Sequence, residues 1–434
     1  MLGMKNVRRV LSTYSADLFG INSALYELGG LIVMHDASGC NSTYNTHDEP
    51  RWYDIKSMIY ISALTEKDII LGNENKLIAD IISCVNELPI EGKPKFIVIS
   101  QSILPHFINT DMYYIASMVE KNLGIRTFAF TTNGIDSYVL GANYAFDMLA
   151  HNFVSSRNEV RASSSEGKIK LNLLGLTPLD FSTVGNVESL KEIFSRGELS
   201  INSSIAMGNS LDDIRRAGNS HVNLVLSSTG INAALTLNKK FGTPFIIGLP
   251  TCKENYELII RMLKESVIDK KSRMLLDDGP KIIDPESFSP DNKFENILTN
   301  GGVMIVGEPV LASSLRFNLK SLGYEDVKII CPTEYDCGLL KPGDLKISDE
   351  KKFEDVLNAA DVIIADPIYK RVLTKDNKEK IPFVNFPHEA FSGRMYRSYI
   401  PVFCRDDDGL NKLIEDQITS PLEIVYNDMM INPF

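Results

Sequence analysis

The amino-acid sequence predicts an α/β fold made of doubly wound units with parallel sheets, and three features support this prediction. Short apolar runs of strand length recur along the 434 residues. These runs are almost continuously apolar rather than alternating, which is typical of strands buried on both faces of a parallel sheet. Amphipathic segments of helical length separate the runs, and polar or glycine-containing turns lead from strand to helix.

The apolar runs give the expected strands, which are Gly30–Met34, Phe96–Ser100, Thr127–Thr131, Lys170–Leu174, Leu224–Leu226, Phe245–Gly248, Val303–Val306, Val327–Ile330, Val362–Ala365 and Phe383–Phe386. The segments between them give the expected helices, among them Lys76–Asn86, Met112–Asn122, Ser189–Phe194, Leu211–Arg216, Leu311–Leu322 and Lys351–Asn358. Repetition of strand, turn, helix and strand is the pattern of doubly wound sheets.

Chain length and two polar segments divide the sequence into units. A chain of 434 residues is too long for one typical domain. Ser155–Lys168 is rich in serine, and Lys270–Asn300 is rich in Asp, Pro, Lys and Asn, so both are expected to link domains. We predict domains at residues 1–157, 165–290 and 298–415, with a C-terminal segment, 416–434, that packs back on the body.

Charge and hydropathy exclude several classes of protein. The net charge is −11 and no basic block is present, which argues against a nucleic-acid groove or an anionic membrane surface as partner. No apolar run reaches the roughly 18–20 residues of a membrane helix. Polar residues follow Lys5, Arg8 and Arg9 where a signal peptide would be apolar. We therefore expect a soluble, cytoplasmic protein.

Six cysteines, at positions 40, 84, 252, 331, 337 and 404, form no Cys-x-x-Cys pair and no disulfide framework. They are expected to be free thiols, core residues or thiolate ligands of a soft metal. Cys331 and Cys337 are spaced too loosely for a typical metal knuckle. Cys84 lies among apolar residues at helical spacing and is expected in the core.

The most informative segment is 29–43 (GGLIVMHDASGCNST), where an expected strand ends at His35–Asp36 and turns through Gly39 onto Cys40. Backbone N–H groups of such a turn stabilise a thiolate. The alternative is a cysteine in an ordinary strand-to-helix turn with no special role. The glycine loops after other strands match neither dinucleotide nor P-loop patterns, so no nucleotide site is predicted.

Several segments resemble nitrogenase component 1 proteins. His35–Cys40 (HDASGC) is similar to that family's His-Gly-Pro-x-Gly-Cys element, and Thr65–Leu77 and Phe96–Asp111 resemble the stretches that follow it. Further similar segments are Asn172–Phe181, Phe241–Pro250, Val303–Pro309, Ala365–Tyr369 and Pro387–Arg394. The resemblance, strongest to clostridial nitrogenase-like chains, covers nearly the whole chain in the family's order.

This resemblance implies three Rossmann-like domains and assembly with a homologous subunit into a heterodimer or heterotetramer. It also implies an iron–sulfur cluster near the subunit interface, supplied with electrons by a separate ATP-dependent iron–sulfur reductase. The family includes reductases of dinitrogen, protochlorophyllide, chlorophyllide and nickel tetrapyrroles, and scaffolds for cofactor assembly.

The chain departs from the family at the cluster ligands. The family supplies three cysteines from the first domain, and only Cys40 matches one of them. Residues 12–17 (STYSAD) stand at the upstream position, and Gln101 and Ser102 at the downstream one. A [4Fe–4S] cluster usually needs four thiolates, so a cluster bound through Cys40 would be shared with a partner. Asp17 or Asp36 could replace a thiolate, as a carboxylate does in the protochlorophyllide branch.

The nitrogenase active-site cofactor is held by a cysteine and a histidine, for which Cys252 and His388 are the nearest candidates. Their surroundings do not match the nitrogenase signatures, so dinitrogen reduction is not expected. His388 and Arg394 are the candidate catalytic residues, and Arg394 and Arg397 are placed to bind an anionic substrate through bidentate pairs. The alternatives are a histidine bonded to nearby backbone and arginines in surface salt bridges.

The function expected from these observations is that of one subunit of a nitrogenase-like, two-component reductase. It would pass low-potential electrons through an interface iron–sulfur cluster to a small organic or tetrapyrrole-like substrate. One alternative is a cluster-poor scaffold or ligand-binding, regulatory subunit on the same fold. Another is an unrelated doubly wound ligand-binding protein or transferase, because a fold alone does not determine chemistry.

Overall fold

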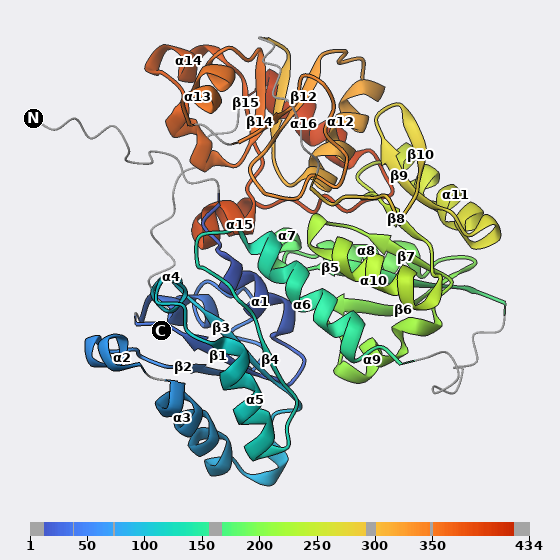
Figure 1. Ribbon diagram of the computed structural model, residues 1–434. Helices are drawn as coiled ribbons and strands as arrows, with labels where there is room; N and C mark the ends of the chain where they lie inside the picture. The colour runs from blue at the N-terminus through green and yellow to red at the C-terminus, as the bar shows by residue number, and fades with distance from the viewer. Residues whose placement is uncertain are drawn as a thin grey trace, which may run out of the picture.

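Three mostly parallel β-sheets, each flanked by helices, form the framework of the chain in the computed structural model (Figure 1). The structure describes residues 13–37, 39–72, 74–155, 167–291, 301–347 and 350–420, with only the backbone described at Gly39 and Cys40. Most of the serine-rich segment, the end of the second expected linker and residues 421–434 lie outside this range. No helix among the described residues has the length and apolar character needed to cross a bilayer.

The first sheet has the order β2-β1-β3-β4 and is parallel throughout. Its strands are β1 (Leu31–His35), β2 (Met58–Ile61), β3 (Ile97–Gln101) and β4 (Thr127–Ala129). Helices α3 (Glu74–Glu87) and α5 (Met112–Leu123) cover one face, while α1 (Asp17–Leu25) and α6 (Tyr138–Asn152) cover the other. Because β2 and β3 flank β1 on opposite sides, the strand order reverses between β1 and β3, which is where ligands bind in open α/β sheets.

The second sheet has the order β10-β9-β8-β7-β5-β6. Its strands are β5 (Ile169–Leu176), β6 (Leu199–Ala206), β7 (Val222–Val225), β8 (Phe245–Ile247), β9 (Ser272–Leu276) and β10 (Gly279–Ile283). The pair β9–β10 is antiparallel, unlike the other pairs. The expectation of a linker over Lys270–Asn300 is therefore wrong for its first half, because the apolar side chains of Met274, Leu275 and Leu276 extend the sheet and are buried.

The third sheet is parallel, with the order β13-β12-β11-β14-β15. Its strands are β11 (Val303–Val306), β12 (Val327–Cys331), β13 (Leu345–Lys346), β14 (Val362–Ala365) and β15 (Phe383–Asn385). The strands of the three sheets thus come from three successive parts of the chain. The domain limits of 1–157, 165–290 and 298–415 stay a prediction, and residues 416–420 form the end of α16 and the residue after it.

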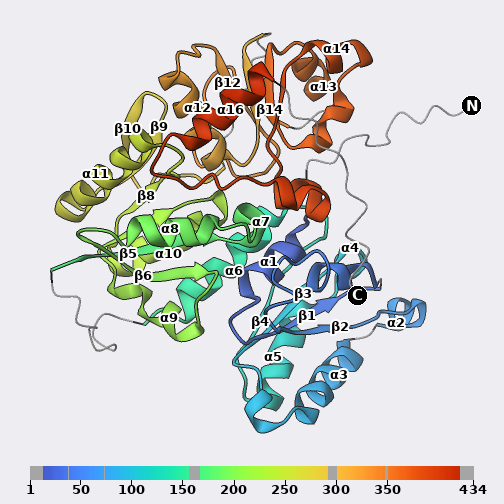
Figure 2. The ribbon, with the colours of Figure 1, turned by 180° about the vertical axis from the view of Figure 1, so that it is seen from behind.

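The remaining α-helices are α2 (Glu66–Leu71), α4 (Ile103–Phe107), α7 (Pro178–Phe181), α8 (Asn186–Phe194), α9 (Leu211–Arg215), α10 (Ile231–Phe241), α11 (Lys253–Asp269), α12 (Pro309–Ser321), α13 (Glu350–Asn358), α14 (Lys375–Lys380), α15 (Glu389–Ser392) and α16 (Gly409–Thr419). Short helices α7 and α15 contact each other where the three sheets approach, beside α1 and α6 (Figure 2). This junction brings residues from distant parts of the sequence together.

All ten expected strands form, with small shifts at their ends, and the predicted fold class is confirmed. Among the described residues, five further strands form without a matching prediction, and four of them, β2, β6, β10 and β13, lie at the edges of their sheets. An edge strand is shielded on fewer sides than a central one and does not need a continuous apolar run. Strand β6, with the sequence LSINSSIA, illustrates this because half of its residues are polar.

Helices α1 and α6 touch through their backbones. A Cβ atom added at Gly20 would lie 2.0 Å from the carbonyl oxygen of Tyr138, and one added at Gly141 would lie 1.8 Å from that of Asp17. The two glycines therefore allow a helix contact that a larger residue at either position would prevent. This contact fixes the position of Asp17 and of the N-terminus of α6.

We predict that Gly141→Ala lowers the free energy of unfolding by about 3 kcal/mol, because the added methyl group forces α1 and α6 apart. The measurement is chemical denaturation of the purified chain. The control is Gly307→Ala, where the nearest atom to an added Cβ is 3.9 Å away. Equal stability of the two variants would contradict the close helix contact.

Candidate functional site

Asp36 lies at the carboxyl end of β1, where the strand order of the first sheet reverses. Its carboxylate accepts three hydrogen bonds. Oδ1 accepts from the hydroxyl of Ser102 and from the backbone N–H of Ala37 at 2.8 Å. Oδ2 accepts from the Asn41 side-chain amide at 2.6 Å. Asn41 comes from the 3₁₀ helix at Gly39–Asn45, and Ser102 precedes α4. One buried carboxylate therefore connects three segments.

Ser62, which follows β2, connects to the same residue from the other side. Its hydroxyl accepts the backbone N–H of Asp36 at 3.1 Å and lies 2.8 Å from Nδ1 of His35. The backbone N–H of Ser102 donates to the carbonyl of His35 at 3.0 Å. The carboxyl ends of β1, β2 and β3 are thus held together at Asp36.

Asp17 is the first residue of α1, and both of its carboxylate oxygens accept backbone N–H groups. Oδ2 accepts from Asn133 at 2.7 Å, and Oδ1 accepts from Gly134 at 2.9 Å and Leu18 at 2.8 Å. Burial raises the pKa of Asp17 to about 7, against the lowering effect of these donors. A Cβ atom added at Gly134 would lie 3.3 Å from the backbone nitrogen of Ile103, the residue after Ser102. Because Gly134 also donates to Asp17, Asp17 and Ser102 lie close together.

The positions expected from the family to carry cluster ligands therefore converge, but their described side chains are oxygen and amide groups. Gln101 lies 3.4 Å from His106 through its amide nitrogen, and its buried oxygen has no partner among the described atoms. Iron–sulfur clusters are held by soft thiolates. The described residues contain no group of three or more His, Cys, Asp or Glu suited to a metal. These residues do not fit a cluster held by this chain alone, and the Cys40 side chain lies outside them.

His388 is buried at the start of α15, between the second and third sheets. Its Nδ1 accepts the backbone N–H of Ala390 at 3.3 Å, which caps the helix. Its Nε2 lies 3.9 Å from Oδ1 of Asp180 and has no hydrogen-bond partner within the described part of the chain. Burial lowers the pKa of His388 to about 3, so the ring is neutral and carries its proton on Nε2.

Asp180 accepts hydroxyl hydrogen bonds from several side chains in this buried junction. Tyr138 donates at 2.6 Å, Ser227 at 2.7 Å and Thr177 at 3.0 Å. Thr177 and Pro178 also begin α7, a common helix start that places Asp180 in the first turn. Tyr138 belongs to α6 and Asp180 to α7, so the first two units are joined here.

Glu308 connects the third unit to this junction. It caps α12 by accepting the N–H of Leu311 at 2.9 Å, and it accepts the N–H of Ser228 at 2.7 Å. Burial raises the pKa of both Asp180 and Glu308, and the neighbouring Asp180 raises that of Glu308 further. The sequence prediction missed both residues. A Thr-Pro and a Glu-Pro helix start indicate caps, but not that the two carboxyls bind neighbouring residues, Ser227 and Ser228.

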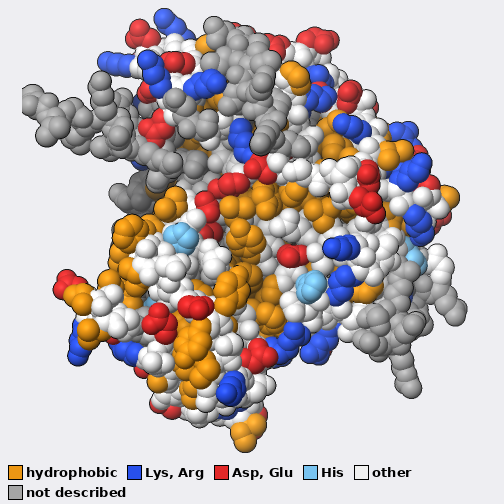
Figure 3. Space-filling model, viewed as in Figure 1, with side chains coloured by type: hydrophobic (Ala, Val, Ile, Leu, Met, Phe, Trp, Pro, Cys, Tyr) orange, Lys and Arg blue, Asp and Glu red, His pale blue; other side chains and the backbone are white. Residues whose placement is uncertain are grey.

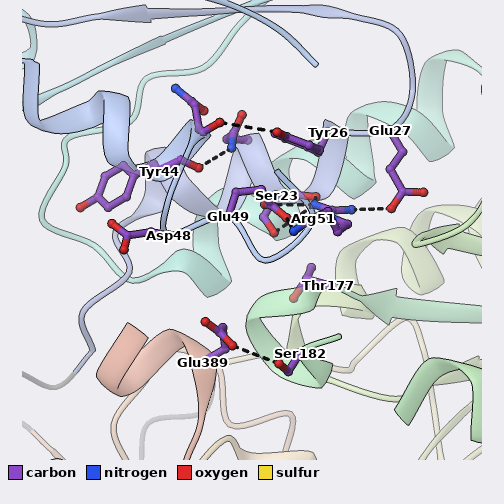
Figure 4. Close-up of polar contacts among 12 residues, drawn as sticks. Ser23, Tyr26, Glu27, Tyr44, Asp48, Glu49, Arg51, Thr177, Ser182 and Glu389 are labelled. Carbon is purple, nitrogen blue, oxygen red and sulfur yellow. Dashed lines mark hydrogen bonds and ion pairs between the residues drawn. The ribbon is translucent and has the colours of Figure 1, made fainter. Parts of the chain in front are cut away.

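A second polar group lies near α15 and the 45–51 segment, and Figure 4 shows Arg51 and Glu49 from the first unit, Ser182 from the second and Glu389 from the third. Arg51 is buried and pairs with Glu49 at 2.7 Å and Glu27 at 2.9 Å. Glu389 is buried between Ser182, at 3.0 Å, and Arg397, at 2.6 Å. The sequence prediction included Arg397 but missed Arg51 and Glu389.

Arg394 lies in a more open place than Arg397. Its side chain is about half exposed, and its Nε lies 3.8 Å from a carboxylate oxygen of Asp48. Arg397 also donates to the backbone carbonyl of Asp48 at 3.2 Å. Arg394 is therefore the arginine that can move toward a ligand, whereas Arg397 is held in place by Glu389.

The buried cysteines are protonated thiols. Burial raises the pKa of Cys252 to about 11 and that of Cys331 to about 12. The Cys252 sulfur accepts the N–H of Asn255 at 3.5 Å and caps α11. The Cys331 sulfur lies 3.5 Å from Thr333. These contacts give both thiols structural partners.

Comparison with known proteins matches this chain to nitrogenase-related proteins. Residues 29–399 match the family described as nitrogenase component 1 type oxidoreductase. The chain is 24% identical over 273 residues to the nitrogenase iron-molybdenum cofactor biosynthesis protein NifE of Clostridium pasteurianum, covering 61% of this chain and 56% of that protein. It is 25% identical over 158 residues to one of the subunits of the light-independent protochlorophyllide reductase of Prosthecochloris aestuarii, covering 36% of this chain and 28% of that relative.

The fold is shared with solved structures. A chain described as nitrogenase Cp1 at pH 6.5 superposes with a TM-score of 0.65 at 15% identity, covering 98% of both chains. A second, described as nitrogenase Cp1 at pH 5, gives a TM-score of 0.62 at 14% identity, covering 96% of this chain and 90% of that one. The sequence matches span only about half or less of the curated relatives' lengths.

We predict that stability falls as the pH rises through the native pKa values of Asp180 and Glu308. Both pKa values are raised in the folded chain, so the native state holds these protons more tightly than the unfolded state does. The resulting stabilisation is fully present below about pH 4, the unfolded carboxyl pKa, and is lost as pH increases.

The measurement is the melting temperature from about pH 5 to about pH 8, a range that spans the raised carboxyl pKa values. Asp180→Asn should flatten this dependence, because the amide cannot ionise and the surrounding hydroxyls can both donate and accept. Asp212→Asn, at an exposed salt bridge, is the matched control. An unchanged slope in Asp180→Asn would contradict the prediction.

Proposed function

We propose that this chain, which belongs to the nitrogenase component 1 type oxidoreductase family, works as one subunit of a nitrogenase-like, two-component reductase. Family membership removes the alternative of an unrelated doubly wound protein. The proposed complex contains a homologous partner subunit, in a heterodimer or heterotetramer, and an ATP-dependent iron–sulfur reductase that delivers electrons. The similarity to one chain of a multi-subunit protochlorophyllide reductase supports this proposal.

The observation that carries the subunit role is an apolar surface beside the converging ligand positions. We call it the α4 surface and define it by Ile103, Leu104, Phe107, Ile108 and Ile135. Phe107 is 84% exposed, Ile135 is 67% exposed and Ile103 is 51% exposed. Figure 3 shows hydrophobic side chains gathered over α4 on this face. Exposed apolar patches of this kind mark protein interaction sites.

The finer proposal places an iron–sulfur cluster, of the [4Fe–4S] type, at this interface. Cys40, on the Gly39 turn, would be the thiolate ligand from this chain, and the partner would supply other ligands. Asp17 and Asp36 are the candidate carboxylate ligands by position, but each already accepts three hydrogen bonds, so Cys40 is the favoured ligand from this chain. When bound, such a cluster supplies low-potential electrons.

The proposed substrate is a small organic or tetrapyrrole-like molecule rather than dinitrogen. His388 is the candidate catalytic residue, as a neutral hydrogen-bond donor to substrate, because its Nε2–H lacks a partner among the described residues. Arg394 is the candidate anion-binding residue because its side chain is only loosely paired. The similarity to a protochlorophyllide reductase supports a tetrapyrrole-like substrate.

The second candidate function is a cluster-poor scaffold or a ligand-binding, regulatory subunit. The oxygen and amide side chains at the expected thiolate positions favour it, because soft iron–sulfur clusters prefer sulfur ligands. The similarity to a cofactor biosynthesis protein is also consistent with a scaffold. Iron content of the assembled complex separates the two candidates.

We predict that Phe107→Glu weakens binding to the partner subunit at least about tenfold, because a charge would be buried in the apolar interface. The measurement is co-purification and affinity with a co-expressed homologous subunit of the same family. Ile268→Glu, at a residue of α11 that is 83% exposed, is the control and should bind normally. Equal binding of both variants would exclude the α4 surface as the interface.

We also predict that the complex purified without oxygen contains iron and sulfide and absorbs in the thiolate-to-iron charge-transfer region. Cys40→Ser should lose the iron or shift this absorption, because a hydroxyl is a poor replacement for a thiolate. Cys84→Ser on α3 is the control. A complex free of iron would contradict the redox role and favour the scaffold, and an unchanged spectrum in Cys40→Ser would exclude Cys40 as a ligand.

A further inference from the structure

We propose that a hydrogen-bonded unit around Asp36 takes the structural place of metal ligation in the first domain, so that this half of the interface site forms without iron. The unit consists of Asp36, Asn41, Ser62 and Ser102. Iron would then enter only in the assembled complex. The proposal rests on the proposed subunit function, and it assigns to this chain a preformed, metal-independent half-site.

The position of the unit is that of a ligand site. Asp36 lies at the carboxyl ends of β1 and β3, where the strand order of the first sheet reverses. Ser102 stands directly after β3, where the resemblance places the third thiolate. The hydroxyl of Ser102 instead donates to the Asp36 carboxylate, and both residues are buried, with exposed fractions of 8% and 7%.

Ligands of one cluster would connect several segments of the chain. In this chain, hydrogen bonds connect the same segments. Asp36 connects β1 to β3 through Ser102, to the Gly39–Asn45 turn through Asn41, and to β2 through Ser62. A structural metal site stabilises a fold by the same kind of cross-connection between segments. Side-chain and backbone groups of the chain itself therefore hold these strand ends together.

The chemistry of the unit also disfavours its use as a ligand set. A carboxylate has about four lone-pair positions, and Asp36 uses three of them for Ser102, Asn41 and Ala37. Binding a metal through both Asp36 and Ser102 would require the hydrogen bond between them to break. Hard hydroxyl and carboxylate oxygens would then replace soft thiolates.

Asp17 supports the same conclusion from the other side of the site. Its carboxylate joins α1 to the loop after β4 through the N–H groups of Asn133 and Gly134. The upstream ligand position is thus also occupied by an oxygen group that holds two segments together. Each described segment around the site has its own hydrogen-bonded anchor.

The test is thermal unfolding of the full chain, expressed without its partner and purified without oxygen, before and after treatment with EDTA and bipyridyl. We expect less than about one iron per chain, where a bound [4Fe–4S] cluster would give four. The melting temperature should not change on chelation. Substantial iron in the isolated chain, or a lower melting temperature after chelation, would overturn the proposal.

The unit itself is tested with Ser102→Ala, which should lower the melting temperature by about 3 °C with and without chelator, because a buried charged hydrogen bond is lost. Asn41→Ala tests the same carboxylate by its other oxygen if Ser102→Ala does not fold. Ser117→Ala, at an exposed serine of α5, is the control. Unchanged stability in both Ser102→Ala and Asn41→Ala would overturn the proposal.

Failure of this proposal is distinguishable from failure of the proposed function. An isolated chain that needs iron for stability overturns the metal-independent half-site and leaves the subunit role intact. An isolated chain that is stable without iron, whose complex with the partner also lacks iron, supports the half-site and contradicts the redox role.

Discussion

The contact between the backbones of α1 and α6 is the constraint on which the rest of the site depends. Gly20 and Gly141 allow these helices to approach so closely that added Cβ atoms would overlap the opposite backbone. Asp17 at the start of α1 is thereby placed beside the loop after β4. The start of α6 is placed at the junction of the three units, where Tyr138 reaches Asp180 and Ser137 donates its backbone N–H to Glu334 at 2.9 Å.

Two chemically different regions follow from this arrangement. At the carboxyl end of the first sheet, the carboxylates of Asp17 and Asp36 each accept three hydrogen bonds beside an exposed apolar surface. At the junction of the three units, buried carboxyls are surrounded by hydroxyls and a neutral histidine. The first region has the character of a protein interface, because its apolar side chains are open to a partner. The second has the character of a packed interior in which charge is disfavoured.

The fold is predictable from the sequence where burial is uniform. Central strands such as β1, β11 and β14 are shielded on both faces and must be continuously apolar, so their runs are recognisable. The edge strand β6 carries polar residues and shows no such run. The edge strand β2 is apolar in sequence but only half-buried. In sequence, the hairpin of β9 and β10 resembles a linker because its apolar strand is short and is followed directly by the charged turn at Asp277 and Asp278.

The sequence by itself determined the doubly wound α/β class and the candidate residues Asp17, Asp36, His388 and Arg394, because these depend on local periodicity and on motifs in the family's order. Only the tertiary structure showed that Ser102 donates to the Asp36 carboxylate and that Asp180 and Glu308 bind neighbouring residues of one loop. Asp36 and Ser102 are 66 positions apart, and the N–H that Glu308 binds is 80 positions away. Such contacts are created when separate strands pack side by side, and no local pattern in the chain records them.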